Sequence, residues 1–274
     1  MKHWKIDQLP WDRFDPSRVD PKIVPLIKTA SVVERNSTDY VVYLKNVFKD
    51  EPHLAPIFEK WAEEEVQHGD ALGKWAMLAD PQWDYQKAFE DFRKFYKIDL
   101  DVNDSIRGSK TAEFIARAMV ETGTSSYYSA LADYVDEPVL KDLCRRIAGD
   151  EFRHFKLFYD KMNHYLQLQP ISKWKRAYIA LSRILESQDD EMASAFHVTN
   201  EPMGMPYNRK RCMAIYMTHA IPVYRLLHIT RVVNMVFKTI GWMPPNKLQN
   251  YLSKGIYALI QRKQRVYAEK IAAL

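Results

Sequence analysis

The chain has 274 residues, of which 47% are hydrophobic and 27% charged, so it can bury a sizeable core. It holds only 8 Gly and 14 Pro, and few alternating β-branched runs, which favours helices over sheet. The first residues contain no apolar secretory core and no run of 18 uncharged apolar residues exists, so we expect neither a secretory signal nor a membrane span. Cys144 and Cys212 are far apart and outside any C-x-x-C pair, and are expected to be reduced thiols in a cytoplasmic protein.

Charge is distributed unevenly along the chain. Residues 1–169 carry 24 Lys/Arg and 29 Asp/Glu, a net charge of −5, whereas residues 170–274 carry 16 and 6, a net charge of +10. A basic surface in the last third would suit an acidic partner or an anionic membrane surface. The alternative is an ordinary solvated helical face that is rich in Lys and Arg.

The first two thirds of the chain predict an all-α fold. Residues 1–20 are rich in Trp, Asp and Pro and are expected to form an arm that packs on the surface. A crossover helix is expected at 82–98 and a loop at 101–108. The hydrophobic periodicity predicts four long helices, at about 21–49, 54–79, 110–135 and 138–166. We therefore expect residues 21–169 to form a four-helix bundle with a long connection between two helix pairs.

The last third, residues 170–274, is expected to pack on the bundle as a basic helical extension. Its patterns predict, in order, a helix over Ser172–Ser194, a loop over 196–208, an apolar helix over Arg209–Ile240 with a kink at Pro222, and a basic amphipathic helix over Lys247–Ala272.

A pair of repeated motifs stands out within the predicted bundle. Glu65 and His68 form one E-x-x-H pair, and Glu151 and His154 form a second. Residues three apart share one face of a helix, so each pair can offer two ligands to one metal ion. A lone Glu34 lies 31 residues before the first pair and a lone Glu121 lies 30 residues before the second. A dinuclear carboxylate site in a four-helix bundle has this ligand set: one Glu from each of two helices, and E-x-x-H from each of the other two.

The chemistry of these residues favours metal binding. Four glutamates on apolar helix stripes would be costly in a dry core without partners. Two divalent cations would supply four positive charges against the four carboxylates. Carboxylate and imidazole without thiolate suit iron or manganese, with zinc as a further alternative. The competing interpretation is four buried glutamates satisfied by Arg and Tyr, beside two core histidines.

Several neighbouring polar residues are candidates for supporting the site. Metal-bound histidines usually donate their second N–H to a carboxylate or carbonyl, and Asp150 is expected to orient a histidine across the pair, His68. The Thr124 hydroxyl lies one turn beyond the lone glutamate of its helix, and either faces the metals or bonds back to a helix carbonyl. Arg35 and Arg153 are expected off the metal stripe, in surface ion pairs.

The motifs resemble those of a known enzyme family. Residues 58–72 resemble the E-E-x-x-H-G-D-x-L segment of the soluble acyl-acyl-carrier-protein desaturases, and residues 147–154 are similar to their A-x-D-E-x-R-H segment. Residues 121–124 look like their E-x-x-T, and Glu34 matches their first lone glutamate. The resemblance covers residues 25–165 and identifies the chain as a member of the ferritin-like di-iron carboxylate superfamily.

The resemblance implies a fold, a reaction and a set of roles. It implies a ferritin-like bundle in which two iron ions activate dioxygen and hydrogen is removed from two adjacent carbons of a long acyl chain. A ferredoxin-type protein would supply the electrons, acyl carrier protein would present the substrate, and the enzyme would be a homodimer. Thr124 would lie by the oxygen site, and Asp150 would be the supporting acid. By position, the metal ligands would be Glu34, Glu65, His68, Glu121, Glu151 and His154.

The last hundred residues, from Lys173 on, do not match this family, and they keep other functions open. Their basic helices could dock acyl carrier protein or lie on a membrane and admit a lipid. The same metal ligands would also serve a monooxygenase on another apolar substrate, a ferritin-like iron-oxidising protein without organic substrate, or a manganese catalase. We expect no nucleic-acid partner, because the basic residues follow no known binding module.

Overall fold

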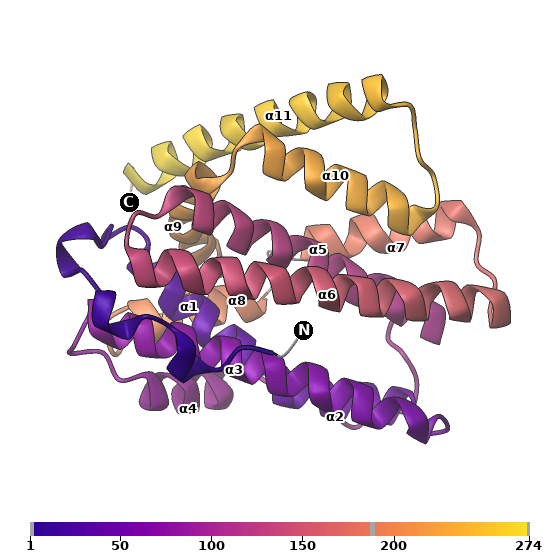
Figure 1. The fold of residues 1–274 in the computed structure, drawn as a ribbon, viewed down its shortest axis with the longest axis horizontal. Helices are drawn as coiled ribbons and strands as arrows, with labels where there is room; N and C mark the ends of the chain where they lie inside the picture. Colours follow the sequence, from indigo (N-terminus) through magenta and orange to yellow (C-terminus); the bar gives the residue numbers. More distant parts are fainter. Residues whose placement is uncertain (1–2, 187–189, 273–274) are drawn as a thin grey trace.

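The computed structural model describes residues 3–186 and 190–272. Within these ranges the chain forms α-helices and short 3₁₀ turns and contains no β-strand, so the predicted all-α fold is confirmed. The helices α3, α5 and α6 and the broken pair α1 and α2 form a bundle that encloses most of the buried side chains (Figure 1). Their bounds are Val24–Arg35 for α1, Ser37–Val47 for α2, Ala55–Ala79 for α3, Lys110–Tyr134 for α5 and Pro138–Leu168 for α6.

The bundle is built from two pairs of neighbouring helices. α1 packs along α3, and α5 packs along α6. The helix α4, Tyr85–Phe95, lies in the connection between the two pairs and packs against α1 and against α8, Asp190–Asn200. This is the crossover that the sequence predicted at 82–98, and it is followed by the predicted loop.

The first bundle helix differs from its prediction. A single helix over 21–49 was expected, but the structure has two, which meet at Asn36. The Asn36 side chain donates to Glu191 of the neighbouring helix α8 at 3.3 Å, and Tyr40 donates to the same carboxylate at 2.6 Å. These contacts to α8 accompany the break between α1 and α2, and hydrophobic periodicity along one helix cannot reveal them.

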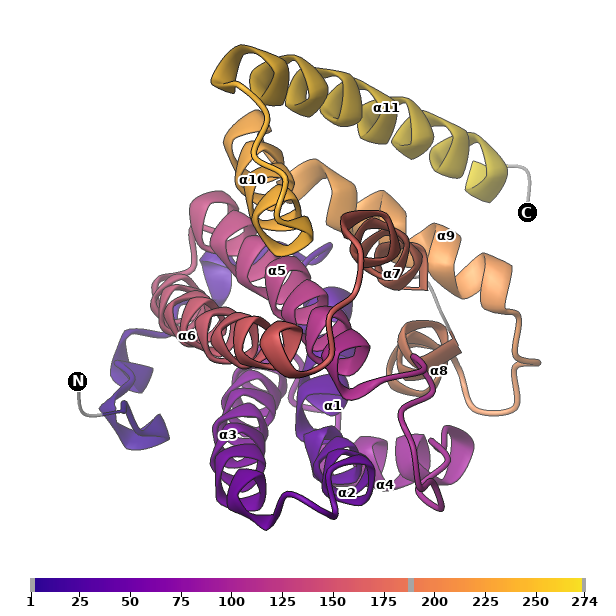
Figure 2. The same ribbon diagram turned by 90° about the vertical axis from the view of Figure 1, so that its right-hand side faces the viewer.

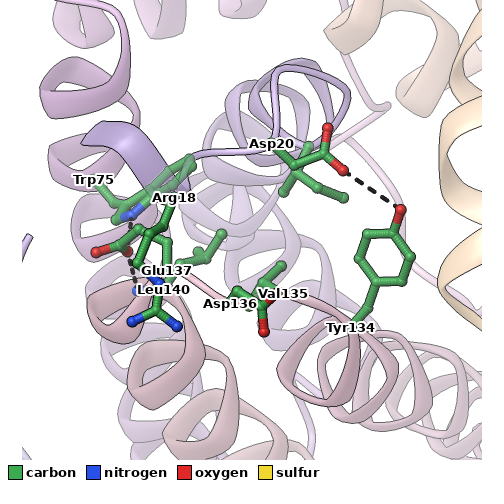
Figure 3. A pocket seen from close by; sticks show the side chains of 9 residues that line it. Arg18, Asp20, Trp75, Tyr134, Val135, Asp136, Glu137 and Leu140 are labelled. Carbon is green, nitrogen blue, oxygen red and sulfur yellow. Dashed lines mark hydrogen bonds between the residues drawn. The ribbon is translucent and has the colours of Figure 1, made fainter. Parts of the chain in front are cut away.

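The start of α6 has an unusual cap. Glu137 is 1% exposed, and its carboxylate accepts hydrogen bonds from the backbone N–H groups of Val139 and Leu140 at 3.2 and 2.7 Å. It also accepts one from Trp75 Nε1 at 2.7 Å, so the cap ties α6 to α3. A cavity of about 170 Å³ lies beside it, with a hydrogen bond between Tyr134 and Asp20 on the other side (Figure 3).

Glu137→Ala is expected to destabilise the protein by about 2 kcal/mol, because it removes a helix cap and leaves the indole N–H of Trp75 without its acceptor. Urea unfolding followed by circular dichroism measures the change. Asp136→Ala, next to it and exposed, is the matched control and should change the stability by less than about 0.5 kcal/mol. Equal stability of the two variants would contradict the capping role.

In the last third of the chain, α7, α9, α10 and α11 pack on the side of the bundle away from α2, α3 and α4, whereas α8 packs against α1 and α4 (Figure 2). Residues 173–186 and 190–194 are helical, as expected for Ser172–Ser194, and residues 187–189 lie outside the described part of the chain. Two predictions here were wrong. The expected loop over 196–208 begins as helix, which runs to Asn200. Pro222 does not kink one helix but lies in a 3₁₀ turn between two, since it lacks an N–H for the helix ladder. The bounds are Lys173–Glu186 for α7, Asp190–Asn200 for α8, Arg209–Ala220 for α9, Leu226–Ile240 for α10 and Asn246–Ala272 for α11.

The N-terminal arm packs on the bundle through three short 3₁₀ turns, at Ile6–Gln8, Trp11–Arg13 and Pro16–Arg18. Trp4 and Leu9 are 8% and 3% exposed, as the aromatic content of the arm predicted. Among the described residues, no helix combines the length and the apolar character needed to cross a bilayer.

Candidate metal centre

The structure brings the six predicted Glu and His residues together in the centre of the bundle. Glu34 comes from α1, Glu121 from α5, and the two E-x-x-H pairs from α3 and α6. They form two overlapping groups, within each of which one ligand atom per residue lies within 4.8 Å of the others. The groups are Glu34, Glu65, His68 and Glu151, and Glu65, Glu121, Glu151 and His154.

Two carboxylates belong to both groups. Sequence spacing suggested two separate half-sites, but Glu65 and Glu151 each face both. A carboxylate has two oxygens and can bind two cations at once. The arrangement therefore offers two adjacent cation positions that share two glutamates, each completed by one histidine and one further glutamate.

The close approach of α1 to α3 depends on Gly69. A Cβ atom at this position would lie 2.7 Å from both the Arg35 nitrogen and the Ser31 carbonyl oxygen of α1, which no side chain can tolerate. Because Gly69 directly follows His68, this contact holds α1 against α3 at the depth of the candidate site. It thereby places Glu34 within reach of the pair on α3.

His68 is held in the orientation that a metal ligand needs. Its Nε2 lies 3.0 Å from Asp150 Oδ2, as the sequence predicted for this acid. Its Nδ1 lies 3.3 Å from Glu65 and 3.2 Å from Glu151. One ring nitrogen is thus engaged by an outer carboxylate while the other faces the shared carboxylates, which is the usual arrangement at metal sites.

His154 has the same arrangement with a partner that the sequence analysis missed. Its Nε2 lies 2.9 Å from Glu64 Oε2, and its Nδ1 lies 2.9 Å from Glu65 and 3.7 Å from Glu121. The signal was present in the sequence, because Glu64 precedes Glu65 just as Asp150 precedes its own shared glutamate. Each outer acid orients the histidine of the opposite helix.

Glu64→Ala is expected to weaken metal binding about 10- to 100-fold, because His154 loses the carboxylate that orients its ring. The dissociation constant for Fe²⁺, measured by competition with a chelator, checks this. Glu63→Ala changes the exposed neighbouring residue of α3 and should leave the constant unchanged. If both variants bind Fe²⁺ like the wild type, Glu64 has no orienting role.

Three further side chains contact the carboxylates and the outer acid. The Thr124 hydroxyl donates to Glu151 and also lies 3.3 Å from the Val120 carbonyl oxygen. One position of the hydroxyl therefore makes both of the predicted contacts. Tyr128 donates to Glu34. Trp4 stacks on His68, with ring centroids 6.0 Å apart, and donates through Nε1 to Asp150 at 2.7 Å. The arm residue Trp4 was not expected here, because nothing in its local pattern links it to the distant bundle.

The two arginines lie at different distances from the site. Arg35 pairs with Asp70 at 3.6 Å, away from the site. Arg153 pairs with Asp150 and lies 3.3 Å from Glu64, so it touches both outer acids. It is half-exposed and lies off the metal stripe, as expected. However, its ion pairs are with the two acids that orient the histidines of the site.

The buried carboxylates repel one another unless positive charge is present. Burial and the charges of Glu65 and Glu151 raise the pKa of Glu34 well above its usual range, and burial with the same two neighbours raises that of Glu121. Burial lowers the pKa of His154, but Glu65 and Glu64 outweigh it and raise the pKa to about 9. The cluster thus favours bound positive charge.

Among the described side chains, three atoms that face the centre of the site make no hydrogen bond of normal geometry. Within the described residues, Glu121 Oε1, Glu151 Oε1 and His154 Nδ1 are buried without a hydrogen bond of normal geometry, although charged atoms lie close to the last two. Unsatisfied oxygen and imidazole atoms that converge among four carboxylates fit divalent cations. The predicted ligand set is therefore chemically suited to two metal ions.

A second group of metal-ligand types is already satisfied by protein contacts. His197 Nδ1 lies 2.5 Å from Glu201, near Cys212, but Arg211 donates to both Glu201 oxygens at 2.7 and 2.8 Å. Burial raises the pKa of the Cys212 thiol to about 11, so it stays protonated. Arginine occupies the position that a cation would need, and the contrast strengthens the case for the central site.

The chain is also similar to a known protein family. A family model described as "Fatty acid desaturase" matches residues 40–214, which is more than half of the chain. The match includes every candidate ligand except Glu34, together with the helices α7 and α8 beyond the bundle. The expectation that nothing from Lys173 on matches the family was therefore wrong as far as residue 214. A comparison with curated proteins found no match.

Proposed function

Because the chain belongs to the fatty acid desaturase family, we propose that it is a di-iron, O₂-dependent oxidoreductase that introduces a double bond into a long acyl chain. The observation that carries the proposal is the pair of shared carboxylates, Glu65 and Glu151, between two histidines. Two adjacent metal positions suit a reaction that takes two electrons and two protons from one substrate. Manganese is the alternative metal.

When bound, iron would supply the redox chemistry that activates dioxygen. The chain's own residues would hold and shield it. The two histidine Nδ1 atoms and the four glutamates would be the ligands, and Asp150 and Glu64 would fix the rings. The Thr124 hydroxyl, which donates to Glu151, can hold or pass a proton beside the metals. Glu151 and His68 are fully buried, so bulk water is kept from the reacting atoms.

The partners of the reaction follow from its chemistry and from the charge distribution. Reduction of O₂ to two waters takes four electrons and four protons, and the acyl chain gives up two of each. A ferredoxin-type protein would supply the other two electrons, and solvent the other two protons. Acyl carrier protein would present the acyl chain as a thioester, and a related lipid is the other source of substrate. We also propose a homodimer, as in the family that the motifs resemble.

The activity is tested with the chain reconstituted with Fe²⁺ under anaerobic conditions. Reduced ferredoxin, dioxygen and acyl carrier protein loaded with saturated chains of several lengths are added, and the product is analysed by mass spectrometry. We expect an alkene that has lost two hydrogens. A hydroxylated chain would instead identify a monooxygenase. Oxygen consumption and iron oxidation without any acyl product would favour an iron-oxidising protein and contradict both.

A further inference from the structure

The helix α7 carries an apolar stripe that faces solvent. Trp174, Tyr178, Leu181 and Leu185 recur at intervals of four, three and four residues, which places them on one face of the helix. Their exposures are 80%, 73%, 53% and 77%. Single exposed apolar residues are common on protein surfaces, but a continuous stripe that includes two large aromatics marks an interaction site.

The side of α7 that faces the protein differs from that of an ordinary amphipathic helix. Ile179 and Ala180 are buried there, and the helix packs on α5 and α10. The Arg176 guanidinium also lies on the inner side, and it would meet a Cβ atom at Gly241 at 2.6 Å. α7 therefore directs a cation inward and its largest apolar side chains outward. Its outer face would be more stable against an apolar environment than in water.

The stripe continues beyond the helix. The Trp174 ring lies 6.5 Å from the ring of Trp242, which is 53% exposed in the connection between α10 and α11. α7, α10 and α11 lie on the same side of the molecule, opposite α2, α3 and α4 (Figure 2). We call Trp174, Tyr178, Leu181, Leu185 and Trp242 the α7 patch.

Positive charge lies beside the α7 patch. Lys173 and Lys175 are exposed on either side of Trp174, and α7 contains four Lys/Arg against the single acid Glu186. That acid is paired with Arg107 at 2.6 Å. The helix α11, which packs on α10, adds the exposed cations Lys247, Lys254, Arg262, Lys263 and Arg265 to the same side of the molecule. Trp, Tyr and Leu on one face with Lys and Arg beside them are typical of helices that lie in the interface of a bilayer.

We propose that the α7 patch docks the protein on an anionic phospholipid bilayer, with α7 lying in the plane of the membrane surface. The cations would attract the anionic headgroups, and the apolar stripe would enter the boundary of the acyl chains. A second copy of this chain fits less well, because joining two copies through this face would bring two basic surfaces together, and the one acid of α7, Glu186, is already paired with Arg107. An acidic protein would satisfy the cations but not four exposed apolar side chains.

Vesicle flotation tests the proposal with the metal-loaded full chain. The vesicles contain phosphatidylcholine alone or with about one third phosphatidylglycerol. We expect binding to the anionic vesicles only, and weaker binding at high salt. We expect two double variants, Trp174→Ser/Leu185→Ser and Lys173→Glu/Lys175→Glu, each to reduce binding to the anionic vesicles by roughly tenfold or more. All changed residues are exposed, so circular dichroism should show an intact fold.

Two matched controls separate this surface from general effects. Met203→Ser removes an apolar side chain that is 93% exposed in the loop before α9, and Lys60→Glu reverses an exposed charge on α3. Both should bind like the wild type. The proposal is overturned if the wild type does not float, or if the α7 variants float equally well. It is also overturned if these variants instead dissociate a dimer in gel filtration, or lose binding to purified acyl carrier protein while still binding vesicles.

Discussion

Glu151→Ala is expected to weaken the binding of both metal ions at least about 100-fold, since loss of even an outer partner costs about 10- to 100-fold and we propose this residue as a direct ligand. Its carboxylate belongs to both groups of the site, so neither metal position keeps its full ligand set. Glu34→Ala removes a carboxylate from only one of the two groups, the one that contains His68. We therefore expect the metal content to fall from two ions per chain towards none in the first variant, and towards one in the second.

Metal analysis after reconstitution with Fe²⁺ and gel filtration measures both contents, and the desaturation assay should show no product for Glu151→Ala. Glu90→Ala changes an exposed carboxylate on α4 and serves as the control, with two ions retained. A Glu151→Ala variant that holds one ion, with the same content as Glu34→Ala, would show that the shared carboxylates do not bridge. Two ions in both variants would exclude the proposed ligands.

Gly69→Ala is expected to destabilise the protein by about 2–3 kcal/mol and to lower its metal content. The new methyl group would lie 2.7 Å from backbone atoms of Ser31 and Arg35, which cannot move without moving α1. Glu34 is carried by α1, so its distance from His68 must increase. The change in stability and the loss of metal should therefore appear together.

Gly123→Ala is the matched control for this substitution. Gly123 also lies inside a bundle helix near a ligand, but nothing lies within 4 Å of a Cβ atom there. The change should stabilise the protein by up to about 1 kcal/mol, because alanine is the better helix former. Urea unfolding and metal analysis of both variants check the contrast. If Gly69→Ala is as stable and as rich in metal as Gly123→Ala, close helix contact does not position Glu34.

Much of the bundle could be predicted from local patterns. The long helices α3, α5 and α6 begin and end within about two residues of their predicted bounds, because strong periodicity and flanking Pro or Ser mark their ends. Predictions were weaker at Asn36 and between α7 and α9. At these positions, contacts with distant helices decide where a helix breaks. Local sequence patterns do not contain information about such contacts.

The division between sequence and tertiary structure is clearest at the site. The spacing of Glu65 with His68, and of Glu151 with His154, follows from the geometry of a single helix, so the sequence was enough to pair these residues. Which atoms face one another across the bundle depends on how each helix is rotated and how closely it approaches its neighbours. Only the fold could therefore show that two glutamates are shared, that Glu64 and the arm residue Trp4 support the centre, and that α7 turns its apolar stripe outward.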